Sequence, residues 1–130
     1  VGNALIGKEF FFNQNGKNPF SVNIDLKYNI AGGRRYTPAY SIYDEDTEQY
    51  RLVYDDNQTF AERYPHYSRT DLRIGIKVNG KRITQEWALD VSNLFDRDNP
   101  YRQIVDRQTG DVSYTYQTGF MIIPLYKITF

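Results

Sequence analysis

Strict alternation of apolar and polar residues is the strongest pattern in the chain. In segment 20–30 every even position is apolar and every odd position is polar, from Phe20 and Ser21 to Asn29 and Ile30. Segments 71–78 and 83–92 repeat the alternation. A period of two residues is typical of a strand with two different faces. Together with the first and last apolar stretches, the pattern predicts five principal strands near residues 4–12, 20–30, 69–78, 83–94 and 119–130, and no amphipathic helix.

The connections alternate between short and long. Asn-Gly pairs lie in both short ones, "NQNGKNP" and "NGK", and predict type I′ turns because both central residues of that turn need positive φ. Residues 31–67 and 95–118 are predicted to be long loops, the first with a possible hairpin. We therefore expect an all-β fold, an antiparallel up-and-down meander with the short turns at one end and the long loops at the other.

The two faces of the predicted strands differ in charge. Opposite the apolar face stand the charged residues Asp25, Lys27, Arg73, Lys77, Glu86 and Asp90. A soluble β-barrel or β-sandwich that binds a small ligand would bury the apolar face as its core. A transmembrane barrel would turn that face to lipid and the charged face inward. Alternation alone does not separate these two interpretations.

Composition excludes several classes of function. The chain has 130 residues, enough for one domain over residues 1–130, and equal numbers of acidic and basic residues. Zero net charge gives no general attraction to nucleic acid or to an anionic membrane surface. There is no cysteine for a disulfide or a thiolate site. No apolar run reaches the roughly 20 residues of a membrane helix, although a barrel strand needs only about 10. The first residue, Val1, suggests a mature product or a piece of something larger.

Three sequence segments resemble the end of a known family. They are "RTDLRIGIKVNGKRITQEWALDVSNLFDRDNPY", "YQTGFMIIPLYKITF" and "AGGRRYTP". Their order and spacing, from about Gly7 onward, resemble the last strands of TonB-dependent outer-membrane receptors. The resemblance implies the C-terminal segment of a 22-stranded barrel in the bacterial outer membrane. The intact receptor would take up a large nutrient such as a siderophore, a glycan or a peptide, with no enzymatic activity and no cofactor.

The resemblance also implies partners. They are outer-membrane lipid, the rest of the barrel and its plug, and, through the intact protein, TonB and the barrel-assembly machinery. The plug, the TonB-contacting box and most of the barrel have no counterpart in these residues. Five strands cannot close a membrane barrel, and open edges recruit partners, so the isolated chain is expected to self-associate. The expected lipid-facing residues are Val22, Ile24, Leu26, Leu72, Ile74, Trp87, Leu89, Ile122, Tyr126 and Phe130, and the assembly signal would be Tyr126, Ile128 and Phe130.

Residues 31–67 hold most of the candidate chemistry. Tyrosine suits ligand recognition, and equally suits a loop that packs on itself or an aromatic girdle at the membrane interface. The ligand-binding candidates are Arg34, Arg35, Tyr36, Tyr40, Tyr43, Tyr50 and Tyr54. Asp44, Asp46 and Glu48 alternate as calcium ligands might, but Gln49 takes the place of the glycine that an EF-hand loop needs, so a solvated acidic loop is favoured. The single histidine, His66, provides no triad or metal cluster, and we predict no catalytic site.

Overall fold

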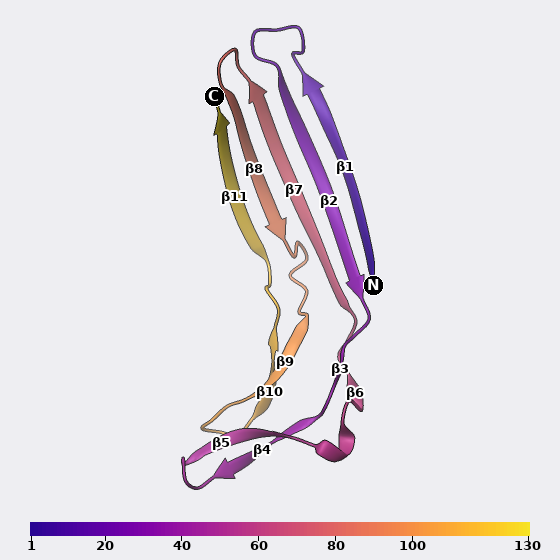
Figure 1. Ribbon diagram of the computed structural model, residues 1–130, viewed down its shortest axis with the longest axis vertical. Coiled ribbons are helices and arrows are strands. Elements are labelled where there is room, and N and C mark those ends of the chain that lie inside the picture. The colour runs from indigo at the N-terminus through magenta and orange to yellow at the C-terminus, as the bar shows by residue number, and fades with distance from the viewer. The chain divides into compact units, whose positions relative to one another are not determined.

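The computed structural model describes residues 1–130 and consists of antiparallel strands joined by turns, with one short 3-10 helix (Figure 1). The prediction of an all-β antiparallel fold is therefore confirmed. No helix is long and apolar enough to cross a membrane. The chain divides into two compact units. We call them the sheet unit (Val1–Ile30, Ser68–Arg97 and Thr118–Phe130) and the hairpin unit (Ala31–Tyr67 and Asp98–Gln117).

The sheet unit is a five-stranded meander. Its strands are β1 (Gly2–Phe12), β2 (Phe20–Ala31), β7 (Tyr67–Asn79), β8 (Thr84–Ser92) and β11 (Met121–Thr129), in the spatial order β1-β2-β7-β8-β11. Neighbouring arrows run in opposite directions in Figure 1. The spatial order of the five strands is the same as their order along the chain. β1 and β11 are the edge strands, and each has one unpaired edge.

Two strand ends differ from the predicted limits for local reasons. β8 stops at Ser92, short of residue 94, because Asn93 adopts a left-handed φ of 51°. β11 starts at Met121, after residue 119, because the backbone N–H of Phe120 donates to Oδ1 of Asp96 at 2.7 Å instead of joining the ladder. A backbone conformation therefore sets the first limit, and a side-chain hydrogen bond sets the second.

The prediction of type I′ Asn-Gly turns was wrong. Neither Asn15 and Gly16 nor Asn79 and Gly80 have positive φ. In the first turn the left-handed residue is Asn13, whose carbonyl accepts from the Gly16 N–H at 2.9 Å. In the second, Asn79 remains in the ladder opposite Thr84, and Gly80 N–H donates to the carbonyl of Ile83 at 2.9 Å. The loop is therefore four residues long, and the two-residue turn does not form.

The hairpin unit contains strands throughout both segments that were predicted as long loops. β3 (Arg35–Tyr36) pairs with β6 (Glu62–Arg63), and β4 (Ala39–Asp44) pairs with β5 (Gln49–Tyr54), followed by the 3-10 helix η1 (Asp56–Gln58). β9 (Pro100–Val105) pairs with β10 (Val112–Tyr116). The Tyr50 N–H donates to the Arg107 carbonyl at 2.9 Å and so ties the β4–β5 hairpin to the β9–β10 hairpin.

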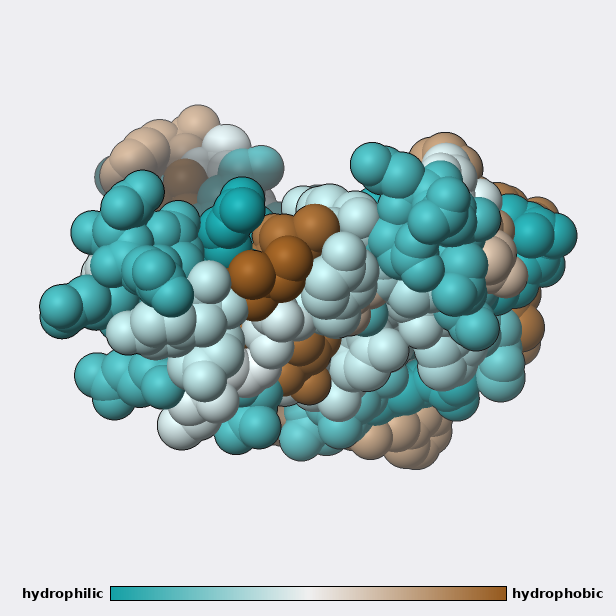
Figure 2. All heavy atoms as spheres, turned by 90° about the horizontal axis from the view of Figure 1, so that it is seen from below, coloured by the Kyte–Doolittle hydropathy of each residue, from teal (hydrophilic) through white to brown (hydrophobic).

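The chain buries very few apolar side chains. Only Tyr64, Ala88 and Val91 are buried among them, and the sheet unit holds the last two. Many large apolar residues are exposed instead. Figure 2 shows such brown apolar side chains at the surface among hydrophilic and neutral ones. These exposed apolar side chains are not covered by any other part of the sheet unit.

Candidate functional site

One face of the five-stranded sheet is apolar across its width. The cross-strand register sets Ile74 opposite Leu89, and Leu89 opposite Pro124. Nine of the ten residues predicted to face lipid lie on this face, and the tenth, Phe130, follows the end of β11. The nine are Val22, Ile24, Leu26, Leu72, Ile74, Trp87, Leu89, Ile122 and Tyr126. Within the strands seven of them are exposed, from 38% for Leu26 and Ile74 to 54% for Tyr126, whereas Val22 and Leu72 are half-buried. We call this surface the apolar face.

Aromatic pairs lie on the apolar face toward the short-turn end. Phe12 stacks on Phe20 with ring centroids 4.9 Å apart, and Trp87 lies 5.2 Å from Tyr126. Of the residues predicted as an assembly signal, Tyr126 and Ile128 belong to this face, and Phe130 is 91% exposed. Aromatic side chains favour a boundary between apolar and aqueous surroundings, so this end of the face suits a membrane interface.

The opposite face of the central strands is charged and largely self-neutralised. Arg73 lies opposite Asp90 and pairs with it at 3.3 Å, and it also approaches Glu86 at 3.9 Å. The Asn23 amide donates to Asp25 at 3.0 Å. Asp25, Arg73 and Asp90 line a cavity of about 500 Å³. We call this surface the polar face.

The edge strands depart from this division. β1 places Leu5 and Phe11 on the polar face, and β11 places Ile123 and Leu125 there, all of them exposed. In the sequence, both the odd and the even positions of the last segment carry apolar residues. The structure shows that this segment is an edge strand with apolar side chains on both faces. Both faces of β11 can contact apolar neighbours.

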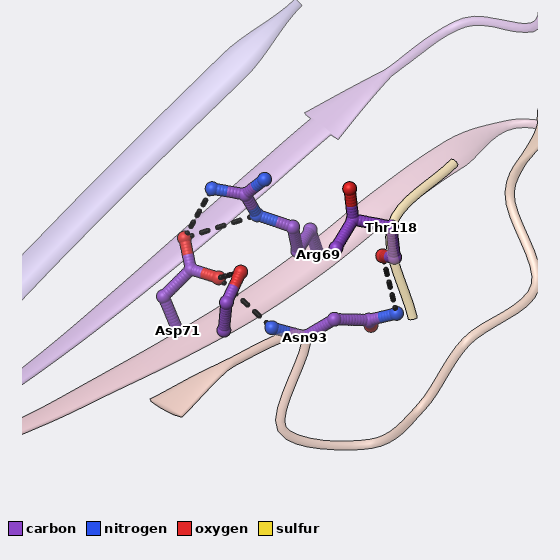
Figure 3. Close-up of polar contacts among 5 residues, drawn as sticks. Arg69, Asp71, Asn93 and Thr118 are labelled. Atoms are coloured by element: carbon purple, nitrogen blue, oxygen red, sulfur yellow. Dashed lines mark hydrogen bonds and ion pairs between the residues drawn. The ribbon is translucent and has the colours of Figure 1, made fainter. Parts of the chain in front are cut away.

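A buried asparagine fixes the chain where it leaves β8 (Figure 3). Asn93 is 1% exposed, and its Nδ2 donates to the carbonyls of Arg97 at 3.0 Å and Thr118 at 3.3 Å, while its Oδ1 accepts from the Arg97 N–H at 3.1 Å. Its backbone N–H donates to Oδ1 of Asp71 at 3.0 Å, and the other oxygen of that carboxylate holds Arg69 at 2.9 Å. Asn93 therefore ties the departing chain at Arg97 to the returning chain at Thr118.

Tyrosines from three segments of the hairpin unit form a cluster. Tyr36 stacks on Tyr64 with centroids 4.2 Å apart, and the hydroxyl groups of Tyr36 and Tyr114 share a hydrogen bond of 3.1 Å. The Arg34 guanidinium lies over the rings of Tyr64 at 5.7 Å and Tyr101 at 6.0 Å, and its Nη2 donates to the Tyr101 carbonyl at 2.6 Å. A cavity of about 310 Å³ adjoins Arg34, Tyr64 and Tyr101. Cation–π contacts of this kind hold the segments together.

The cluster raises the pKa of two phenols. The hydrogen bond with Tyr114, followed by burial, raises the pKa of Tyr36 to about 12. Burial raises the pKa of Tyr64, and the nearby Arg34 guanidinium partly opposes this change. Both groups are therefore neutral phenols well above pH 7, suited to hydrogen bonding and stacking and not to proton transfer near neutral pH.

The other predicted ligand-binding residues lie outside this cluster. Arg35 donates to the Phe60 carbonyl at 3.2 Å, and Tyr40 is 50% exposed on β4. Tyr43 and Tyr50 meet edge to face at 5.2 Å across the β4–β5 hairpin, and Tyr54 lines a second cavity with Tyr50. The candidates are thus divided between two places in the hairpin unit.

The acidic residues of the β4–β5 turn do not form a metal centre. No group of three or more His, Asp or Glu side chains in the chain has the arrangement to hold a metal ion. Asp44 Oδ1 accepts from the Asp46 N–H at 3.1 Å, and Glu48 occupies the left-handed region at φ 53°. These residues shape the turn.

The structure adds residues that the sequence did not single out. Tyr101 and Tyr114 join the cluster from segment 95–118, which was predicted to be a long loop, and Asn93 organises the end of β8. The contact from Tyr36 to Tyr114 spans 78 positions, which no local pattern reveals. Comparisons of the chain with family models, with curated proteins and with solved structures found no match.

Proposed function

We propose that this chain is the C-terminal part of the barrel wall of a TonB-dependent outer-membrane receptor in a Gram-negative bacterium. In the intact protein it contributes to the wall and the extracellular gate through which a large nutrient enters. The rest of the 22-stranded barrel and its plug complete the pore, and TonB supplies the energy through the plug. The chain is not an enzyme in this proposal.

The observation that carries the proposal is the uncovered apolar face. Most of its large side chains are exposed, as Ile24 at 42% and Ile122 at 50% illustrate, while the opposite face pairs its own charges. Lipid covers such a face without a second protein layer, and an aqueous lumen or a plug suits the polar face. A soluble small-ligand-binding sandwich would need a second sheet over the apolar face, and the only apolar side chains that the sheet unit buries are Ala88 and Val91.

The arrangement of the turns and edges supports the same proposal. Both short turns, 13–19 and 80–83, connect sheet strands at one end, whereas the hairpin unit is inserted at the connections of the other end. Short periplasmic turns and long extracellular connections are typical of outer-membrane barrels. The unpaired edges of β1 and β11 would pair with neighbouring barrel strands, and in isolation they favour self-association.

Two leucines on opposite faces provide the test. Leu89 on the apolar face and Leu125 on the polar face are each 39% exposed in adjacent strands. Leu89→Arg should weaken partitioning of the chain from buffer into phosphatidylcholine vesicles by about 2–4 kcal/mol, the cost of arginine on a lipid face. Leu125→Arg should cost less than about 1 kcal/mol. Vesicle titration followed by flotation measures both, and equal losses in the two variants would contradict the proposal.

A further inference from the structure

Three arginines line one cavity of the hairpin unit. The cavity has a volume of about 560 Å³, within the range of small-molecule sites, and lies where β5, β9 and the turn after β9 meet. Its charged lining residues are Arg51, Arg102 and Arg107, against one carboxylate, Asp44. The lining therefore carries a net charge of +2 in a chain whose total net charge is zero.

These guanidinium groups are poorly neutralised by the protein. Arg102 and Arg107 take no part in the ion pairs of the chain. The Arg102 carbonyl accepts from the Thr115 hydroxyl and the Arg107 carbonyl accepts from the Tyr50 N–H, so these hydrogen bonds do not involve the guanidinium groups. Arg51 approaches Asp44 only to 3.8 Å with its side chain 65% exposed, so this pair is weak. By contrast, Arg69 and Arg73 in the sheet unit have carboxylate partners. Like charges gathered without counter-charges repel each other, and a bound anion would relieve that repulsion.

The cavity also offers neutral contacts along two strand edges. Four consecutive residues of β5 (Gln49, Tyr50, Arg51, Leu52) and four of β9 (Arg102, Gln103, Ile104, Val105) line it. Because successive strand residues point to opposite faces, a cavity bordered by four in a row lies alongside the strand edge. β5 pairs only with β4 and β9 only with β10, so each has an edge not used in its ladder. Gln49, Gln103, Tyr50 and Tyr54 thus line the cavity together with the arginines, although the Tyr50 N–H is already bonded to the Arg107 carbonyl.

We infer that this cavity binds a small anionic ligand through its phosphate or carboxylate oxygens. Arg51, Arg102 and Arg107 hold the oxygens, since guanidinium groups match oxyanions in geometry and charge. Tyr50 and Tyr54 contact the uncharged part of the ligand. The role of this cavity as the substrate site of a receptor rests on the proposed function. Anion binding by the hairpin unit does not.

Calorimetric titration of the full chain in detergent with pyrophosphate tests the inference, and citrate in a parallel titration distinguishes phosphate from carboxylate recognition. We expect saturable binding that weakens with salt. The double variant Arg102→Gln/Arg107→Gln should raise the dissociation constant at least about tenfold, as expected for lost charged hydrogen bonds. Asp44→Asn keeps an oxygen for the turn, removes the competing charge, and should lower the dissociation constant severalfold. Lys81→Gln/Arg82→Gln, the same loss of two positive charges in the exposed β7–β8 turn, should leave it unchanged.

Absence of saturable binding for both anions would overturn the inference. An equal loss in Lys81→Gln/Arg82→Gln would do the same, because it would reduce the effect to net charge. Weaker binding in Asp44→Asn would also overturn the inference. Failure here is distinguishable from failure of the proposed function. The arginine variants leave the apolar face intact, so their partitioning into vesicles should match that of the parent chain.

Discussion

Arg73 shows how single residues make the polar face compatible with water. It lies opposite Asp90 and close to Glu86, with about a third of each side chain exposed. Pairs as exposed as these contribute roughly 0–1 kcal/mol each, so they add little stability. Their effect is to neutralise the charges of that face within the sheet itself. Gly75 lies beside them, and a Cβ at that position would overlap the Asn23 amide. Glycine at position 75 therefore allows β2 and β7 to lie close together.

Tyr36 provides a prediction about a single titrating group. Its pKa of about 12, against an ordinary 10.0, depends first on the hydroxyl of Tyr114. Because the folded pKa is the higher one, this contribution to stability is complete below about pH 10 and is lost as pH rises toward 12. Tyr114→Phe should return the pKa of Tyr36 toward 10 and remove that pH dependence.

Carbon-13 NMR of ring-labelled tyrosine across pH 9–13 measures the change. Tyr116→Phe is the matched control, since Tyr116 lies on the same strand, is 51% exposed and makes no contact with Tyr36 among the ring pairs. A Tyr36 that still titrates near pH 12 in Tyr114→Phe would show that the hydroxyl pair is not the cause.

At the scale of elements, the end of β8 depends on Asn93. Asn93→Ala removes the hydrogen bonds to Arg97 and Thr118 and places alanine at a φ of 51°. We expect a loss of about 2–4 kcal/mol in the free energy of unfolding, from unsatisfied buried groups and left-handed strain. Asn93→Gly loses the same bonds without the strain and should cost about 1 kcal/mol less.

Denaturant unfolding in detergent gives the two free energies, and hydrogen exchange at the Arg97 amide reports the local effect. That amide should exchange faster in both variants, because both lack Oδ1 as its acceptor. If glycine destabilised the chain more than alanine did, the left-handed strain assigned to residue 93 would be wrong.

The sequence predicted the sheet better than the hairpin unit. β2, β7 and β8 each separate an apolar from a polar face, so their alternation was visible and their limits fell within about two residues of the prediction. β9 and β10 carry no such division: PYRQIV and VSYTY mix residue types on both faces. Their hairpin depends instead on Asp106, which accepts from the Gln108 and Thr109 N–H groups, and on Gly110 at φ 81°.

The candidate sites were only partly predictable for a related reason. Arg34 and Tyr36 could be singled out by residue type, but their partners Tyr101 and Tyr114 lie on another segment. The three arginines of the second cavity likewise come from two hairpins. Contacts between distant segments depend on how hairpins pack, which alternation does not encode.

At the scale of the whole molecule, the chain has a large sheet but almost no core. The apolar face and the two strand edges remain without partners, while the polar face and the hairpins satisfy much of their hydrogen bonding internally. Such a distribution fits a segment of a wall, which obtains its stability from lipid and from adjoining strands.

Trp87 allows the central claim to be tested directly. It is the single tryptophan, lies on the apolar face and is 44% exposed. In vesicles of brominated phospholipid its fluorescence should be strongly quenched. The variant Trp87→Phe/Leu125→Trp moves the fluorophore to the polar face of the adjacent strand and should be quenched much less. Strong quenching at position 87 alone is the result that our proposal predicts, and equal quenching at both positions, or none at 87, would contradict it.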